Sequence, residues 1–332
     1  MTPVTVKGIP IEVLVAPDSF KGTLSASQVG EAVARGLRAA GADAAVQPLG
    51  DGGEGTLEVL APALGLERRA AMVSDPLGRE IEAEYGFGDA GAVVETAAAS
   101  GLGLVTAAER DAMAASTRGT GELIAAAARD GARRILVAVG GSATTDGGRG
   151  AIAAIREAGG LGEAKLIVLC DVRTPFEDAA RVFAPQKGAS PDQVARLSRR
   201  LHQLARSYAR DPRGLPFTGA AGGLSGGLWA EFGAQLTPGA QFVLDEIGFD
   251  VRMRQARAVI TGEGKLDFQS LAGKAVAEVA TRCRQAGVPC HAVVGKLELD
   301  LFSRRILDLQ MVLEAGTPAD LERAGRELAE RL

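Results

Sequence analysis

The chain has 332 residues, more than one hydrophobic core usually serves, so two domains are expected. Its composition, 46% hydrophobic and 23% charged, is ordinary for a soluble α/β protein, and the formal net charge is -4. Nucleic-acid or anionic-membrane binding would need a basic patch that the sequence does not show, and no apolar run approaches the roughly 20 residues of a membrane span.

The first ten residues and the cysteines predict a cytoplasmic protein. Met1 to Pro10 carries one Lys and no long apolar stretch, unlike a secretory signal. Three cysteines, Cys170, Cys283 and Cys290, cannot all pair and lack metal-ligand spacing, which fits a reducing compartment. Of 37 basic residues only 7 are Lys, so a lysine beside a glycine-rich loop is of interest in this chain.

Strands and helices alternate at both ends of the chain. The short apolar, β-branched runs predict strands at Ile11–Ala16, Ala44–Leu49, Ala258–Thr261, His291–Val294 and Gln310–Leu313. Helices are expected from a cap at Ser25 or Ser27 to about Ala40, and over Thr56–Leu64. This alternation indicates parallel βαβ units, whose functional loops follow the carboxyl ends of the strands.

The middle of the chain has a different pattern. Short strands with a turn at Asp75–Gly78 and a hairpin connection at Gly88–Gly91 are expected between Met72 and Glu95. Beyond them we predict apolar strands at Ile135–Val139 and Leu166–Cys170, a helix within 190–209 and a glycine-rich loop at Gly219–Gly227. The expected organisation is a discontinuous α/β domain, residues 1–70 plus 256–332, with a second α/β domain inserted as residues 71–255.

Five loops after apolar runs combine glycines, acids, hydroxyls and lysines. Their candidate site residues are Asp18, Ser19 and Lys21; Asp51, Gly52 and Gly53; Gly141 and Ser142; Asp171; and Gly262, Glu263, Lys265 and Asp267, with Lys274 beyond. Glycines let a backbone approach phosphate, helix N-termini attract anions, carboxylates hold Mg²⁺, and Lys neutralises a transferring group. These are the parts that phosphoryl transfer needs.

Each loop also has a structural interpretation. Gly-Gly after a strand is often only a tight turn, Asp171 could cap the next element, and Lys187 in Gln186-Lys-Gly188 could be solvated. The P-loop pattern is absent, because Ala275 follows Gly273-Lys274, and no clean G-x-G-x-x-G opens a helix. The only histidines, His202 and His291, make a Ser/His/Asp hydrolase improbable.

Nine co-linear motifs together resemble the bacterial glycerate kinase family that starts from Ala-Pro-Asp-Ser-Phe/Tyr-Lys. They are Ala16–Lys21 with Leu24–Ser27, Asp51–Thr56, Glu95–Leu102, Ser116–Leu123, Gly140–Gly148, Cys170–Val172, Pro185–Ser190, Gly219–Gly223, and Ile260–Asp267 with Gln269-Ser270 and Gly273-Lys274. The resemblance extends from about residue 12 to 296. The motifs occur in the family's order, which is far more specific than any one of them.

The resemblance implies two α/β domains, with flavodoxin-like and restriction-enzyme-like folds, and a cleft between them. It implies phosphorylation of D-glycerate by ATP and Mg²⁺ to 2-phosphoglycerate. Asp18, Ser19, Lys21, Asp51, Asp171 and the Glu263–Asp267 loop would line the cleft. For the mechanism we expect Asp171 or Asp18 as the base, and Lys21 and Lys187 bound to phosphoryl or carboxylate groups. Glu263, Asp267 and Asp51 are the candidates for contact with Mg²⁺, directly or through water.

This chain departs from the family pattern in three places. The segments at Arg156–Ala164 and after Asp171 are shorter, and the pattern is hard to follow after Lys296. The shortening motivates one alternative, a sensor that binds a hydroxy acid or nucleotide without turnover. Kinase activity on another short hydroxy acid is a second alternative. The hydroxyl that is phosphorylated and assembly into a homo-oligomer stay open.

Overall fold

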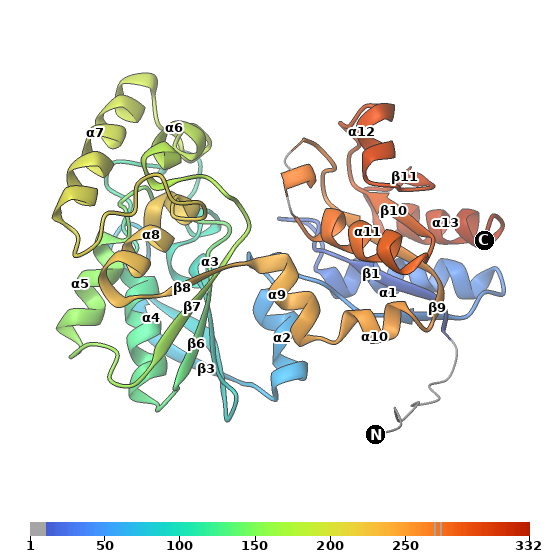
Figure 1. The fold of residues 1–332 in the computed structure, drawn as a ribbon, viewed down its shortest axis with the longest axis horizontal. Coiled ribbons are helices and arrows are strands. Elements are labelled where there is room, and N and C mark those ends of the chain that lie inside the picture. Colours follow the sequence, from blue (N-terminus) through green and yellow to red (C-terminus); the bar gives the residue numbers. More distant parts are fainter. Residues whose placement is uncertain (1–10, 269, 273) are drawn as a thin grey trace. The chain divides into compact units, whose positions relative to one another are not determined.

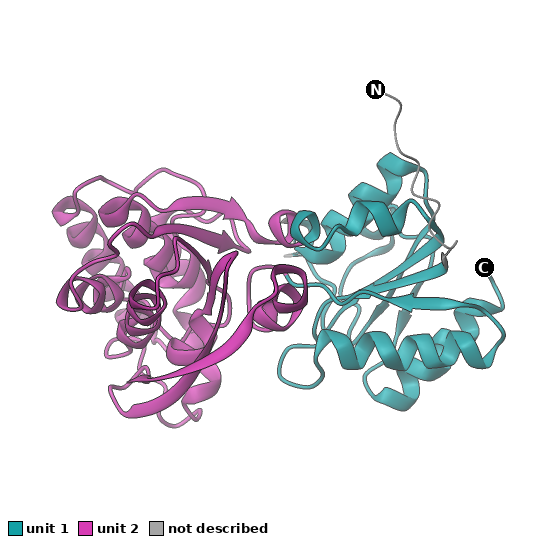
Figure 2. Ribbon diagram, turned by 90° about the horizontal axis from the view of Figure 1, so that it is seen from below, with its two compact units in different colours: residues 1–50, 244–332 teal, residues 51–243 magenta. Residues whose placement is uncertain are grey.

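The computed structural model describes residues 11–268, 270–272 and 274–332 (Figure 1). It divides into two compact units: unit 1 is Met1–Gly50 with Leu244–Leu332, and unit 2 is Asp51–Val243 (Figure 2). Two α/β units, one of them discontinuous, agree with the expected fold class. The limits differ from the domain limits predicted at 70/71 and 255/256, because α2 (Thr56–Leu64) packs on strands of unit 2 and α10 (Phe249–Met253) packs on strands of unit 1. The predicted limits remain a proposal about the folding domains.

Unit 1 contains a five-stranded, fully parallel sheet. Its strands are β1 (Ile11–Pro17), β2 (Ala44–Val46), β9 (Ala256–Glu263), β10 (Cys290–Val294) and β11 (Val312–Glu314). The order is β11-β10-β9-β1-β2. If the five strands are numbered 1 to 5 in chain order, the order read from the β2 edge is 2-1-3-4-5, which is the flavodoxin-like order. The topological switch point of this sheet lies between β1 and β9.

Helices cover both faces of this sheet, as the teal unit in Figure 2 shows. The first layer is α1 (Ala26–Ala39) and α13 (Pro318–Ala329), which share a core with Val13, Val15 and Ile260. The second layer includes α11 (Ala275–Ala286) and α10, packed on Leu14 and Val259. The remaining elements are η4 (Ser270–Ala272), α12 (Leu301–Ile306) and α9 (Gly239–Glu246), which spans the limit between the units. Since both faces are covered, β1 is buried from Val13 to Ala16, which explains the apolar run over these residues.

The first predicted helix is confirmed with its cap. Ser25 precedes α1, its hydroxyl accepts from the Gln28 N–H, and the Gln28 side chain accepts from the Ser25 N–H. This capping box satisfies two backbone donors that a helix otherwise leaves open. The helix therefore starts at Ala26, and Ser25 is the cap residue directly before it.

Unit 2 contains a six-stranded mixed sheet in the order β3-β4-β5-β6-β7-β8. The strands are β3 (Glu67–Ser74), β4 (Glu80–Gly88), β5 (Gly91–Glu95), β6 (Arg134–Ala138), β7 (Lys165–Cys170) and β8 (Gln235–Pro238). The turn at Asp75–Gly78 joins β3 to β4, and the hairpin connection at Gly88–Gly91 joins β4 to β5, both as predicted. From β5 to β8 the pairing is parallel.

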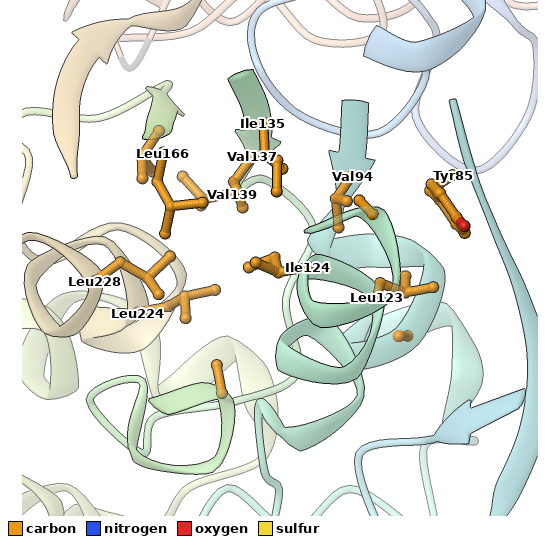
Figure 3. Close-up of a cluster of buried hydrophobic side chains, with 14 of the residues drawn as sticks. Tyr85, Val94, Leu123, Ile124, Ile135, Val137, Val139, Leu166, Leu224 and Leu228 are labelled. Atoms are coloured by element: carbon orange, nitrogen blue, oxygen red, sulfur yellow. The ribbon is translucent and has the colours of Figure 1, made fainter. Parts of the chain in front are cut away.

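The largest core of unit 2 lies between this sheet and two helices. Leu123 and Ile124 of α4 (Arg118–Arg129) and Leu224 and Leu228 of α8 (Ala220–Phe232) face Val137 and its neighbours on the strands (Figure 3). The other helices of the unit are α3 (Thr96–Ser100), η1 (Leu102–Leu104), α5 (Arg149–Glu157), η2 (Phe176–Asp178), α6 (Ala179–Phe183), η3 (Pro185–Lys187) and α7 (Pro191–Ser207). No helix in the described part of the chain is long and apolar enough to span a membrane.

The prediction of a loop at Gly219–Gly227 is wrong for its last part, from Leu224 to Gly227. Residues 221–223 have left-handed φ values, but the chain from Leu224 onward is helical within α8. The glycines serve close packing here, because a Cβ on Gly226 would lie 2.6 Å from a Phe176 ring atom and one on Gly227 would lie 2.3 Å from the Gly147 carbonyl oxygen. Glycine-rich sequence therefore marks tight contact here as well as a turn.

Candidate active site

A pocket of about 350 Å³ lies at the carboxyl edge of the sheet of unit 1. Its lining residues follow the ends of parallel strands or begin a helix, and they are Asp18, Ser19, Phe20, Lys21, Thr23, Glu263, Gly264, Lys265, Lys274, Gly295, Lys296 and Gly316. The pocket thus spans the switch point, where α1 leaves β1 toward one face and α11 follows β9 on the other. Ligands of open α/β sheets bind in this crevice.

The loop after β1 is held in place by backbone bonds and one buried ring. The Asp18 N–H donates to the Gly262 carbonyl (2.8 Å), and Phe20 pairs with Leu24 across a short turn (2.9 Å). Phe20 is buried, whereas Lys21 is exposed at the turn. The buried Asp18 carboxylate accepts the Ser19 N–H at 2.7 Å. The loop therefore presents an acid, a hydroxyl and an ammonium from a fixed frame.

Two glycines let the neighbouring loops approach this frame. A Cβ on Gly264 would lie 3.2 Å from the Phe20 Cα, and one on Gly295 would lie 2.5 Å from the Gly264 carbonyl oxygen. Side chains at these positions would push the three strand ends apart. The Thr-Gly-Glu-Gly-Lys motif thus has a steric reason for its second glycine.

Four of the chain's seven lysines, and none of its arginines, line the pocket. Lys265 and Lys296 both reach the Glu298 carboxylate at 2.7 Å, and Lys265 lies 3.4 Å from Asp267. The hydrogen bond from Lys265 holds the pKa of Glu298 below its usual range, and the bond to Glu298 raises the pKa of Lys265. Both groups are exposed, so water screens the pair.

Lys274 adds a second kind of positive group to the pocket. It is the N-cap residue of the 12-residue helix α11. The first N–H groups of a helix lack partners within it, and the helix dipole favours an anion at that end. Because Lys274 lines the pocket, the start of α11 lies next to it in the chain.

The structure separates the predicted site residues of unit 1 into two groups. Asp18, Ser19, Lys21, Glu263, Lys265 and Lys274 line the pocket. Gly262 does not; a Cβ there would lie 2.2 Å from the Val293 carbonyl oxygen, so this glycine serves strand packing. Asp267 contacts Lys265 outside the lining. Gln269 and Gly273, also part of the recognised motif, lie outside the described residues.

Sequence reasoning missed Lys296 as a pocket residue. It follows β10 in a Gly-Lys pair, on the strand next to β9. The scarcity of lysine and the expected position at a strand end were both visible in the sequence. Combining them would have identified it.

In unit 2, a buried lysine joins two of the predicted motifs. The Lys187 ammonium donates to the Ser142 hydroxyl (2.9 Å) and to the Thr144 carbonyl oxygen, and the Lys187 residue is only 3% exposed. The alternative of a solvated Lys187 is wrong. Burial lowers its pKa to about 7, against the attraction of Asp146 and Asp171. Near neutral pH this side chain changes charge, which is unusual for lysine.

The other predicted residues of unit 2 lie around the ends of β6 and β7. Asp51 is buried and its carboxylate accepts the Gly53 N–H at 3.0 Å. Gly52 has a φ of 90°, and a Cβ there would lie 2.9 Å from the Leu169 carbonyl oxygen. Gly141 also has positive φ, and its carbonyl accepts from Leu102 at 2.8 Å. Asp171 follows β7 and is partly buried.

Asp146 was not among the predicted residues, yet it fixes the loop that carries Ser142. Its buried carboxylate accepts from the Thr117 N–H and hydroxyl (both 2.9 Å), from Gly148 (3.0 Å) and from Gly150 (3.1 Å). These bonds tie the loop to the start of α4. The Thr-Thr-Asp-Gly-Gly sequence does not indicate this role, because the partner Thr117 is 29 residues away.

The acidic residues of the pocket suit a magnesium ion that arrives with a phosphate ligand. Asp18 and Glu263 line the same space as the lysines, and Mg²⁺ needs only one or two carboxylates beside substrate oxygens. Among the described residues no group of three or more His, Cys, Asp or Glu could hold a metal by itself. The donor set of the pocket therefore fits a metal ion that shares its ligands with the substrate.

Several known proteins are similar to this chain over most of its length. The family model described as the glycerate kinase family matches residues 13–158 and 156–332. The chain is 36% identical to glycerate 2-kinase of Escherichia coli K12, covering 88% of this chain and 87% of the relative. It is 35% identical to glycerate kinase of Bacillus subtilis 168, with coverage of 96% and 97%. A solved structure from Salmonella typhimurium LT2, provisionally named glycerate kinase 2, has a TM-score of 0.79 at 33% identity, with coverage of 97% and 98%.

Proposed function

Because the chain belongs to the glycerate kinase family, we propose that it phosphorylates D-glycerate with ATP and forms 2-phosphoglycerate. In this reaction a glycerate hydroxyl oxygen bonds to the γ-phosphorus of ATP. The bond from that phosphorus to the β–γ bridging oxygen breaks, ADP leaves, and the hydroxyl proton passes to a carboxylate base. The protein's task is mainly to position the two substrates and neutralise charge.

The observation that carries this proposal is the composition of the pocket in unit 1. Lys21, Lys265, Lys274 and Lys296 supply cations around one space of about 350 Å³. A triphosphate is the ligand that such a set suits, since compact ammonium groups neutralise phosphate oxygens. We assign the phosphates of ATP to this pocket.

Asp18 and Glu263 are the residues that would hold Mg²⁺ beside those phosphates. The ion supplies charge neutralisation to the phosphoryl group when bound. Activity should disappear when EDTA removes divalent cations and return when Mg²⁺ is added. Activity that persists in EDTA would contradict this part of the proposal.

The base is either Asp18 or Asp171, and matched substitutions separate them. A general base contributes roughly 10²- to 10⁴-fold to the rate. Asp171→Asn should therefore lower kcat by that amount if Asp171 is the base. A near-normal rate in Asp171→Asn together with a large loss in Asp18→Asn would leave the role to Asp18, beside its place near Mg²⁺. Equal, near-normal rates for both variants would remove both residues from the role. The binding roles expected from the sequence for Asp51, Ser142 and Lys187 stay predictions.

An assay that couples ADP formation to NADH oxidation tests the function. Purified protein with Mg-ATP should form ADP only when D-glycerate is present, and L-glycerate and glycolate serve as comparison acceptors. A faster rate with another short hydroxy acid would change the substrate. Tight binding of glycerate or ATP by calorimetry, without ADP formation, would instead support the non-catalytic sensor.

A further inference from the structure

Large apolar side chains are exposed on unit 1 close in sequence to the lysine pocket. Phe268 is 66% exposed and lies three residues after Lys265. Phe302, in the first turn of α12, is 73% exposed, and Leu301 and Ile306 of the same helix are exposed by more than half. Exposed aromatic residues that gather on one surface commonly mark a binding site.

Two parallel segments connect the pocket to these side chains. Leu266 pairs with Leu297 in a parallel bridge: the Leu266 N–H donates to the Lys296 carbonyl and the Glu298 N–H donates to the Leu266 carbonyl, both at 2.9 Å. This register sets Lys265 beside Lys296, and the shared carboxylate of Glu298 holds the two ammonium groups. The cationic end of the surface is thereby fixed.

Both aromatic residues follow this bridge closely along the chain. Phe268 is two residues after Leu266, and Phe302 is five residues after Leu297. Three residues of chain span at most about 10 Å, so Phe268 lies within that reach of Lys265. Leu299 and Ser303 are buried, which anchors the second segment and turns Phe302 outward. On both segments an exposed aromatic ring thus follows a pocket lysine within a few residues.

We propose that Phe268 and Phe302 hold the nucleobase of the phosphoryl donor, a purine nucleoside triphosphate whose phosphates occupy the lysine pocket. This rests on the proposed function and names the part of the site that binds the base. A base has an apolar π face that stacks on aromatic side chains, whereas its phosphates need cations. The order of the two regions along the segments matches the order of these parts in the ligand.

Kinetics of Phe268→Ala and Phe302→Ala test the assignment. Base–aromatic stacking is strong enough that losing one ring should raise the KM for ATP roughly tenfold. The KM for D-glycerate should stay within about twofold, and Phe268→Tyr should restore the KM for ATP because it retains the ring. Val251→Ala, which shortens another exposed apolar side chain of unit 1, is the matched control.

Inorganic tripolyphosphate separates the base from the phosphates. It has no base, so its inhibition constant against ATP should be unchanged in Phe268→Ala and should rise in Lys265→Met. An unchanged KM for ATP in both Phe variants would overturn the assignment while the kinase function stands. A change in oligomeric state without a change in that KM would show that the surface instead binds a second copy of the chain.

ATP binding by equilibrium dialysis keeps the two proposals distinguishable. If the wild-type protein does not phosphorylate glycerate, the proposed function fails. The nucleobase site still stands if ATP binds and both Phe variants bind it roughly tenfold more weakly. It is overturned if ATP does not bind, or binds the wild-type protein and the variants equally.

Discussion

Replacing the buried Lys187 by methionine should change how the stability of the protein depends on pH. The pKa of Lys187 is lowered from 10.5 to about 7, because burial disfavours the charged form. Between these values the unfolded chain binds a proton that the folded chain does not. The free energy of unfolding of the wild-type protein should therefore rise as the pH rises from 7 toward 10.5.

The size of this effect follows from the shift. The slope approaches about 1.4 kcal/mol per pH unit well inside the window, so the contribution of Lys187 grows by about 2 kcal/mol between pH 7 and pH 9. Lys187→Met removes the titrating group and also the bonds to Ser142 and Thr144. Losing those bonds changes the free energy of unfolding by a nearly constant amount at all pH values. The lowered pKa is therefore tested by the slope of the free energy of unfolding against pH, and not by its value at one pH.

Urea denaturation of wild type, Lys187→Met and Lys165→Met at pH 7, 8 and 9 measures the slopes. Lys165 is exposed at the start of β7, so its variant should follow the pH dependence of the wild type. The free energy difference between wild type and Lys187→Met should grow by about 2 kcal/mol in favour of the wild type across this range. Parallel profiles for these two proteins would refute the lowered pKa and the burial that causes it.

Three further predictions concern packing, the loop of unit 2 and the pocket. Gly222→Ala should destabilise the protein by more than about 3 kcal/mol, because its Cβ would lie 2.1 Å from the Thr144 carbonyl oxygen. Gly214→Ala, with similar φ but open space, should cost only about 1 kcal/mol, and equal losses in thermal or urea unfolding would contradict the contact. Asp146→Asn should lower the free energy of unfolding by about 2 kcal/mol, because a charged acceptor of four hydrogen bonds is lost. An unchanged midpoint of thermal or urea unfolding would contradict this role of Asp146. Lys296→Met should raise the KM for ATP about tenfold with little change in the KM for glycerate, and the reverse pattern would assign Lys296 to the acceptor.

The sequence predicted most elements of unit 1, because parallel strands that are buried on both faces consist of short runs of apolar residues. β1 was expected at Ile11–Ala16 and ends one residue later, and β10 begins one residue before the predicted His291. Functional loops were expected after the carboxyl ends of these strands, and Asp18, Glu263 and Lys265 from two such loops do line one pocket. The position of the switch point could not be predicted, because it depends on the order of the strands in the sheet, which no local sequence pattern specifies.

Other features depend on contacts between distant residues. Lys187 is buried because η3 brings it under the loop that carries Ser142, and nothing beside Lys187 in sequence indicates that burial. The helix at Leu224–Phe232 was missed because glycine lowers helix propensity, while packing against Phe176 and Gly147 outweighs that preference. Asp146 was overlooked for the same reason, since its main partner is on another element.

Phosphorus NMR of the reaction mixture tests the central claim most directly. Protein, Mg-ATP and D-glycerate are incubated together, and the new phosphomonoester signal is recorded with proton coupling. We predict a doublet, because the phosphorus of 2-phosphoglycerate couples to the single proton on C2. A triplet would show phosphate on C3, where the phosphorus couples to two protons. The kinase activity would then stand, and 2-phosphoglycerate would be the wrong product. The absence of any new phosphomonoester that depends on D-glycerate would contradict the proposed function.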